Sequence, residues 1–468
     1  MTAVEVLLIP LIAASACLLP IKGLGRALAV VAGLLTAAIV AASVWFGVAY
    51  RVENLSLAGS AGAHLAIDID GWSAAVLMLS GVLFAIGAAA SSDVRRPRAY
   101  FALWSLLQTA VAGVLVARDL LLFFSFWEAL LVPLALLMWH WGGADRRAVT
   151  LRLLLYWMTG SALLLTGILA LGVGARTFSF TALSAYRLPE GSQVIFALLF
   201  LAAFAVRLPL FPFHVWLPRT CVAAPVPVAI VLAGVVSKTA IYAIARICVP
   251  FFPRGMADLA PFLVALATAG ALYGALLATR QRDTRRFIAY ASVSQLDLIA
   301  LGAFLATPPG LEGALVASVS HGLVVATLFL LVAALARRTG SFEPGRGGLA
   351  SRAPVLGSFF VIAILATLGA PGTSGAPGEL LILAAAFDRS AGIGMLAALV
   401  LVASAVYGVR LLHAVFSVPA ADRGPDLGWR EQALIVPLLV LVIALGVAPV
   451  VISDLLPPSG PPLSERLR

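Results

Sequence analysis

Five charged side chains lie inside segments that are otherwise apolar and long enough to cross a membrane: Glu128, Arg207, Lys238, Asp297 and Glu379. A charge at the centre of a bilayer costs about 2.5–3.5 kcal/mol even on lenient scales, so such residues mark ion paths or buried ion pairs. A proton relay needs buried groups that each bias the proton affinity of the next. The alternation of acids and bases along this chain fits a relay, and an ion-pair brace between helices is the competing interpretation.

Lysine is almost absent from this chain, which makes its position informative. Of the 31 basic residues only Lys22 and Lys238 are lysines, and Lys238 lies in the middle of an apolar segment. An arginine keeps its proton in a protein, whereas a lysine removed from water can release one. We therefore expect Lys238 to carry protons, and Arg207 to be a fixed charge that keeps Glu128 ionised.

Two histidines lie in the same kind of segment. His321 follows Ser318 and Ser320 in a polar stripe that suits a hydrated path, so we expect it to join the relay. For His214 both a relay role and a packing role are open. Asp297 either relays protons or pairs with a neighbouring helix.

The composition is that of an integral membrane protein. Apolar residues make up 62% of the 468 residues and charged residues 11%, against about a quarter charged in soluble domains, and the mean hydropathy is +1.06. The net charge of +10 comes from arginines in short loops, which indicates loops at a lipid bilayer and not a nucleic-acid partner. The three cysteines show no CxxC or pairing pattern, so we expect neither a metal site nor a disulfide. No cofactor motif is present.

Fourteen apolar runs predict fourteen transmembrane helices and no soluble domain. The first run, residues 4–19, lacks a basic leader and a cleavage motif, so we interpret it as a span and not as a signal peptide. The odd-numbered loops carry 20 basic residues, and the even loops with the C-terminal tail carry nine. This bias places the odd loops in the cytoplasm and both termini outside a bacterial inner membrane. The expected spans are residues 3–20, 27–49, 70–90, 99–117, 119–141, 150–173, 193–217, 225–248, 258–279, 286–306, 311–336, 354–387, 391–416 and 432–452.

Two of these spans contain residues that interrupt helices. The seventh span includes Pro209 and Pro212, and the twelfth includes Pro371 and Gly372. Proline breaks a helix, and interrupted helices in corresponding positions are typical of inverted repeats with ion sites between them. We therefore predict an all-helical, polytopic fold with breaks in spans seven and twelve. Its parts are residues 1–98 (spans one to three), 99–248 (first five-helix repeat), 258–416 (second, inverted repeat) and 430–468 (last span and tail).

Six stretches between residues 119 and 387 resemble a known family. They are FWEALLVPLALL, FAVRLPLFPFHVWLP, LAGVVSKTAIYAIARI, DTRRFIAYASVSQ, SVSHGLVVATLFLLVAAL and LATLGAPGTSGAPGELLIL. In this order and spacing they are similar to the antiporter-like membrane subunits of complex I, most closely to those of the subunit M type. The resemblance implies a subunit of a proton-pumping NADH-quinone oxidoreductase that has no redox centre of its own and works beside other membrane-arm subunits.

The resemblance also implies a role for each matching residue. Glu128 matches the family's glutamate in span five, Lys238 its central lysine in span eight, His321 its connecting histidine and Glu379 its terminal acid in span twelve.

The chain departs from the family chiefly in its first half. Arg207 stands where the family usually has a lysine, and the turn at residues 217–225 lacks the family's acids and histidine. The family's SVSHMG is replaced by SVSQLD, which places Gln295 and Asp297 in that motif.

These residues predict a proton path from the cytoplasm to Lys238, through His321, to Glu379 and the outside. Glu128 and Arg207 are expected to act as an electrostatic switch on Lys238. Two alternatives stay open. One is a module of a cation/proton antiporter or a membrane-bound hydrogenase complex. The other is a structural paralogue that no longer conducts, which Arg207 favours.

Overall fold

The computed structural model describes residues 3–46, 51–56, 64–343, 353–416 and 425–456. Within this part, twelve helices are long and apolar enough to cross a membrane, so the chain is a multi-pass membrane protein with a helical body. The end of the predicted span 27–49 lies outside the described residues, as do five arginines of the charge count: Arg346, Arg352, Arg423, Arg466 and Arg468.

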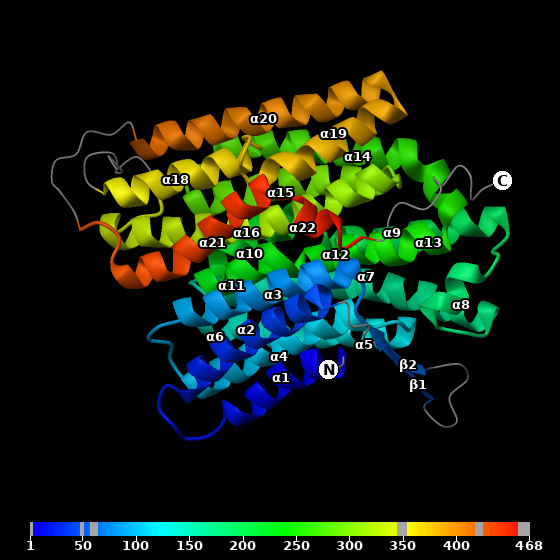
Figure 1. Cartoon of the computed structure of the whole chain (residues 1–468), viewed down its shortest axis with the longest axis horizontal. Coiled ribbons are helices and arrows are strands. Elements are labelled where there is room, and N and C mark those ends of the chain that lie inside the picture. Colours follow the sequence, from blue (N-terminus) through cyan, green and yellow to red (C-terminus); the bar gives the residue numbers. More distant parts are fainter. Residues whose placement is uncertain (1–2, 47–50, 57–63, 344–352, 417–424, 457–468) are drawn as a thin grey trace.

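The helices run side by side in one bundle (Figure 1). The long ones are α2 (Leu24–Trp45), α3 (Gly71–Ala90), α4 (Pro97–Val116), α5 with α6 (Leu120–Ala129, Leu131–Trp141), α7 (Arg146–Ala175), α9 (Glu190–Arg207), the span Val226–Phe251, α14 (Pro253–Arg280), α15 (Thr284–Phe304), α16 (Pro308–Thr339), α20 (Ala391–Phe416) and α21 (Trp429–Val447). The shorter ones are α1 (Ala3–Ala16), α8 (Phe180–Ala185), α10 (Trp216–Ala223), α18 (Pro354–Thr367), α19 (Gly375–Arg389) and α22 (Val450–Ser453).

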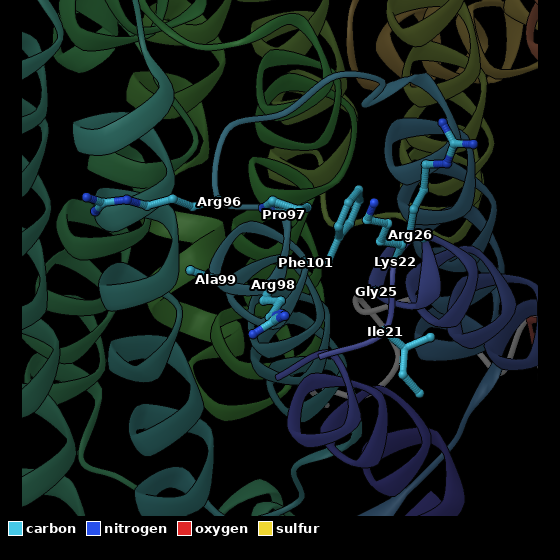
Figure 2. Close-up of a pocket in the computed structure, with 10 residues that line it drawn as sticks. Ile21, Lys22, Gly25, Arg26, Arg96, Pro97, Arg98, Ala99 and Phe101 are labelled. Atoms are coloured by element: carbon cyan, nitrogen blue, oxygen red, sulfur yellow. The ribbon is translucent and has the colours of Figure 1, made fainter. Parts of the chain in front are cut away.

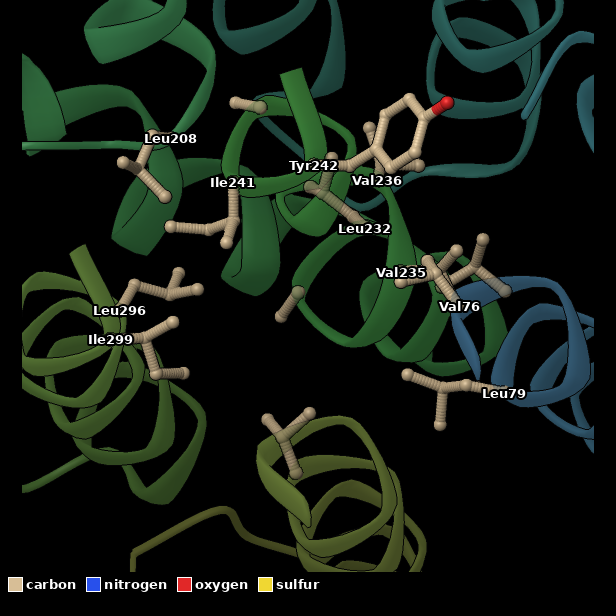
Figure 3. Packing of buried hydrophobic residues seen from close by; sticks show 14 of the residues in the cluster. Val76, Leu79, Leu208, Leu232, Val235, Val236, Ile241, Tyr242, Leu296 and Ile299 are labelled. Atoms are coloured by element: carbon tan, nitrogen blue, oxygen red, sulfur yellow. The ribbon is translucent and has the colours of Figure 1, made fainter. Parts of the chain in front are cut away.

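The span Val226–Phe251 lies in the middle of the bundle and is enclosed by other helices. It consists of α11 (Val226–Val231), η2 (Leu232–Val236), α12 (Lys238–Ala243), η3 (Ile244–Cys248) and α13 (Val249–Phe251), of which η2 and η3 are π-helical. This span carries Lys238 at its middle, and a charged residue facing lipid is costly, which favours a position inside the bundle. Figure 3 shows this packing, with side chains of α3 and α15 on either side of the span.

Two of the apolar segments are interrupted. After α9 the chain is not helical until the short 3₁₀ turn η1 (Phe213–Val215), which leads into α10. After α18 it is again not helical until α19 begins. Proline lacks the N–H that a continuing helix needs, which accounts for the breaks at Pro209, Pro212 and Pro371. Arg207 is therefore the last residue of α9 and lies directly before the first break.

A β-hairpin corrects the prediction of a purely helical chain. Strand β1 (Arg51–Ser56) pairs antiparallel with β2 (His64–Asp68), with Val52 opposite Ile67. The segment before α3 alternates apolar residues (Leu65, Ile67, Ile69) with polar or small ones, which is the period of a strand and not of a helix. Ile67 also bridges to Ala117 in the loop after α4, so the hairpin is attached to the helical body.

The end of the bundle opposite the hairpin (Figure 1) carries a cavity lined by basic residues, which Figure 2 shows from close by. It has a volume of about 470 Å³ and lies where α2 and α4 begin. Four cationic residues line it, Lys22, Arg26, Arg96 and Arg98, together with apolar residues such as Phe101. The hairpin and this basic cavity therefore mark the two ends of α3.

Candidate functional site

Lys238 has no exposed surface and lies at the middle of the enclosed span. Its Nζ donates to the backbone oxygen of Ala233 at 2.5 Å and lies 2.6 Å from Nδ1 of His321. The preceding turn is the π-helix η2, a wider turn that often occurs at functional sites. Here it leaves the Ala233 carbonyl within reach of a side chain five residues later. The amine is thus held by one backbone group and one titratable side chain.

Lys238 and His321 meet because two glycines let their helices approach closely. A Cβ on Gly322 would lie 2.8 Å from the backbone oxygen of Gly234, and a Cβ on Gly234 would lie 3.5 Å from the backbone oxygen of Gly322. A methyl group at Gly322 would therefore push α16 away from η2. These glycines lie close to the two functional residues in the sequence, but only the packed structure shows that they face one another.

The contact between Lys238 and His321 can hold a proton on either side. A lysine ammonium only donates hydrogen bonds, while a neutral imidazole has one donor and one acceptor nitrogen. At 2.6 Å the proton resides on Nζ facing a bare Nδ1, or on Nδ1 facing a neutral amine. Exchange between these two states needs no movement of either helix.

A small polar cavity separates His321 from Glu379. Its volume is about 20 Å³, which is enough for about one water molecule. Polar groups converge on it from α15, α16, the end of α18 and α19. Its lining residues are Gln295, Ala317, Ser320, His321, Val324, Ala366, Thr367, Gly375 and Glu379. A histidine and a carboxylate thus face the same water-sized space.

Glu379 is positioned by the break that precedes α19. Its side chain is buried, and a Cβ on Gly369 would lie 2.2 Å from Oε2, so the carboxylate rests directly on that glycine. Gly369 has a φ of +62°, a conformation that glycine adopts without the steric cost of a side chain. Ser374, the last residue before α19, is tied to α16 by a 2.8 Å contact with the hydroxyl of Ser320. The broken backbone therefore fixes both the acid and the wall of the cavity.

Arg207 lies apart from this cavity, between two tryptophan rings. Its guanidinium carbon is 3.5 Å from the centre of the Trp127 ring and 4.7 Å from that of Trp157, and it donates to the backbone oxygen of Trp127 at 3.1 Å. Such stacking stabilises a cation that has been removed from water. In the described part of the chain Arg207 makes no ion pair, although the charge of Glu128 still acts on it. Among the described residues Arg207 and Glu128 are therefore not in direct contact as an ion pair, and any effect of one on the other acts through space.

Asp297 and His214 each lie beside Phe211, in the break after α9. The Asp297 carboxylate is completely buried and lies beside the backbone of Phe211, and a Cβ on Gly270 of α14 would be 2.0 Å from its Oδ2. The His214 ring stacks on Phe211, with 5.8 Å between ring centres, and meets Tyr273 edge-on. Both candidates thus flank Phe211, and neither lines the cavity beside His321.

The candidates predicted from the sequence therefore separate into three groups. Lys238, His321 and Glu379 form a connected series, whereas Glu128 with Arg207 and His214 with Asp297 lie elsewhere. The positioning residues that sequence reasoning missed are glycines and neutral polar groups, namely Gly234, Gly322, Gly369 and Ser374. In the sequence, Gln295 was notable only as a departure from the family motif. The spacing of side chains along α15 does not show that Gln295 lines the same cavity as Glu379 of α19. No group of three or more His, Cys, Asp or Glu residues gathers for a metal among the residues with described positions.

Comparisons with known proteins agree on one family. The family profile described as NADH:quinone oxidoreductase/Mrp antiporter, TM, matches residues 117–405. NADH-quinone oxidoreductase subunit M of Rhodobacter capsulatus is 32% identical over 417 residues, which cover 85% of this chain and 81% of that protein. A chain of respiratory complex I from Thermus thermophilus with bound NADH superposes with a TM-score of 0.89 at 31% identity, covering 97% of this chain and 98% of the other. A chain of the Mrp complex from Dietzia sp. shares the fold, with a TM-score of 0.85 at 23% identity over 97% of this chain and 96% of its own length.

The contact between Gly369 and Glu379 predicts a specific loss of stability in Gly369→Ala. Both Gly369 and Gly372 have positive φ, so alanine at either position costs about 1–2 kcal/mol of left-handed strain. Only the Cβ at position 369 collides with Glu379, whereas nothing lies within 4 Å of one at position 372. We expect Gly369→Ala to be about 1–3 kcal/mol less stable than the control Gly372→Ala because of overpacking. Thermal unfolding of the detergent-solubilised protein measures this difference, and equal losses would show that the carboxylate does not rest on Gly369.

Proposed function

The chain belongs to the family of transmembrane subunits of NADH:quinone oxidoreductases and Mrp antiporters, and we propose from this that it translocates protons in the membrane arm of an NADH-quinone oxidoreductase-type complex. The relatives and structural neighbours are subunits of multi-subunit membrane complexes. NADH oxidation and quinone reduction then take place in partner subunits, and this chain supplies a proton path through the membrane.

The observation that carries the proposal is the connected series from Lys238 to Glu379. A proton on the Lys238 amine moves to Nδ1 of His321 across their 2.6 Å contact. The imidazole then releases a proton towards the cavity that it shares with Glu379, where one water can bridge the two groups. The carboxylate accepts the proton, and the amine is left free to take up the next one. The cycle closes when Glu379 delivers its proton to the far side and the imidazole regains a bare Nδ1 by exchange between its two tautomers.

Arg207 takes the part of a fixed charge in this scheme. An arginine does not release its proton, and the two tryptophan rings hold the guanidinium in place. Glu128 then acts on Arg207 through space, and a change in the charge of Glu128 alters the field at Lys238. The switch predicted for these two residues is thus electrostatic and requires no direct ion pair.

Asp297 and His214 form a side branch in this proposal. They lie beside the break between α9 and η1, within the first interrupted segment. A fully buried carboxyl group in this position can store a proton near the first half of the protein, where Arg207 cannot.

The finer architecture is also proposed. Adding α1 and the pair α18–α19 to the twelve long helices makes fourteen spans. The two breaks are then five spans apart, which supports inverted repeats at residues 99–248 and 258–416, flanked by residues 1–98 and 430–468. The basic cavity beside α2 and α4 supports a cytoplasmic position for that end, and with it both termini outside a bacterial inner membrane.

A structural paralogue is the second candidate function. Arg207 favours it, because a residue that cannot release a proton stands where the family usually has a lysine. In that case the fold is retained within the complex, while the buried charges only hold helices together.

Replacement of Lys238 tests the proposed path. In inverted membrane vesicles that contain the assembled complex, we expect Lys238→Ala to lower NADH-driven proton uptake by about 100-fold, the lower end of what a positioned proton-transfer group contributes. Lys238→Met keeps most of the side-chain volume and distinguishes loss of the amine from a packing defect. The matched control is Lys22→Ala, which removes the other lysine of the chain. Normal uptake in both Lys238 variants would refute the relay.

Asp297→Asn tests the side branch in the same vesicles. We expect proton uptake to fall several-fold without being abolished, because the Lys238–His321 contact remains. Asparagine has nearly the volume of aspartate, so the substitution removes the titratable group without crowding the packed site. Wild-type uptake in this variant would assign Asp297 to helix packing alone.

Arg207→Lys separates the two candidate functions. If the subunit conducts with Arg207 as a fixed charge, lysine gives no gain in proton uptake, because it stacks less well on Trp127 and Trp157. If the subunit is a non-conducting paralogue, a restored lysine is the change that would return pumping. The measurement is the number of protons taken up for each NADH oxidised, with assembly checked by native gel electrophoresis.

A further inference from the structure

A network of charged and phenolic side chains lies at the hairpin end of the bundle. Asp70, which precedes α3, pairs through Oδ2 with Arg118 at 3.1 Å and with Arg246 at 2.5 Å. Arg118 also donates to the hydroxyl of Tyr242 at 2.6 Å, and that hydroxyl donates to the backbone oxygen of Leu115 at 2.8 Å. We call Asp70, Arg118, Tyr242 and Arg246 the hairpin-end cluster. None of them belongs to the series from Lys238 to Glu379.

The cluster begins one helical turn from Lys238. Tyr242 and Lys238 are four residues apart on α12, so their side chains lie on the same face, separated by about 6 Å along the helix axis. Tyr242 is completely buried, as Lys238 is. From Tyr242 the contacts continue through Arg118 to Asp70, whose side chain is 24% exposed. The cluster therefore lies between the helical turn that follows Lys238 and this end of the protein.

The backbone holds Arg118 from both sides. Its N–H donates to the oxygen of Ala66 in β2 at 2.8 Å, and its own oxygen accepts from the N–H of Phe180 at 2.9 Å. A further bond runs from the N–H of Leu120 to the oxygen of Phe178 at 2.9 Å. Backbone hydrogen bonds thus join three segments that are distant in the sequence, around Ala66, Arg118 and Phe180, and the segment with Arg118 lies between the other two.

Asp70 and Arg118 keep their charges near neutral pH. Burial raises the pKa of Asp70, but the positive charges of Arg118 and Arg246 and the hydrogen bonds from Ser73 outweigh it, so that its pKa lies below the ordinary value. Burial lowers the pKa of Arg118, but Tyr242, Asp70 and Asp68 outweigh this and hold it above the ordinary value. A fixed guanidinium beside Tyr242 repels an excess proton, whereas the cavity on the Glu379 side is lined by neutral groups and an acid.

We propose that the hairpin-end cluster is a proton seal. It closes the direct way from Lys238 to the hairpin end of the bundle, so that the proton on the amine leaves through His321. This inference rests on the proposed function, since it assigns the route by which Lys238 is emptied. The seal makes transfer to the second half of the protein obligatory.

Passive proton leakage tests the seal without any dependence on the redox reaction. Vesicles that contain the complete complex are given a pH gradient without NADH, and its decay is followed with a pH-sensitive dye. We expect the gradient to decay several-fold faster in Arg118→Gln than in the wild type. Tyr242→Phe, which removes only the hydroxyl, serves as a second variant that keeps the ion pairs of Asp70, and its decay is expected to be faster than that of the wild type. The matched control is Glu190→Gln, which breaks an exposed ion pair with Arg254 at the same end of the bundle.

The origin of the leak is checked with a double variant. If the leaking protons travel through Lys238, combining Arg118→Gln with Lys238→Met restores the slow decay of the pH gradient. Wild-type decay in both Arg118→Gln and Tyr242→Phe overturns the seal, and so does a leak that persists in the double variant. The proposed function fails on a different measurement, the NADH-driven uptake of the Lys238 variants. A negative leak assay with Lys238-dependent pumping therefore removes the seal and leaves the relay in place.

Discussion

The buried amine of Lys238 is the constraint around which the rest of the structure is arranged. Its side chain has no exposed surface, and a buried charge needs partners, which here come from the protein. The Ala233 carbonyl and the His321 ring meet this need. Both contacts depend on backbone that departs from the ordinary α-helix or lacks side chains, namely the π-turn η2 and the glycines at 234 and 322. The contact between Lys238 and His321 therefore depends on the irregular backbone of the span.

The two interrupted segments have different roles in the two halves of the molecule. The break after α18 leaves an acid, a serine and a glycine around a water-sized space. The break after α9 instead follows a guanidinium that is stacked between two tryptophan rings. One half therefore offers groups that can exchange a proton, and the other offers a charge that stays in place. This asymmetry supports a role for the first half in control and for the second in delivery.

The cluster at the hairpin end affects the side from which protons reach Lys238. Ion pairs in a partly buried setting are rigid, because breaking one leaves an uncompensated charge. Arg118 is held by such pairs and by backbone bonds to two other segments. Placed one turn from Lys238, this rigid cluster and the proton-exchanging series would make the amine accessible from one side only. A proton carrier in a pump needs such one-sided access.

Much of this protein could be predicted from its sequence. Hydropathy and charge identify a membrane protein, because lipid tolerates only apolar helices and rare functional charges. Lys238, His321 and Glu379 stand out for the same reason, and prolines mark the breaks because a missing N–H acts locally. The segment of the hairpin also alternates apolar and other residues as a strand does, but the long apolar helical segments around it led to the prediction of an all-helical chain.

The tertiary structure alone decided which charges meet. It stacked Arg207 on Trp127 without an ion pair to Glu128. It placed Asp297 away from the cavity that Gln295 lines, and it brought Arg118 to Tyr242 across more than a hundred residues. Such contacts depend on which helices are neighbours and on the glycines that set the distance between them. The hydrophobic periodicity of a single segment predicts neither.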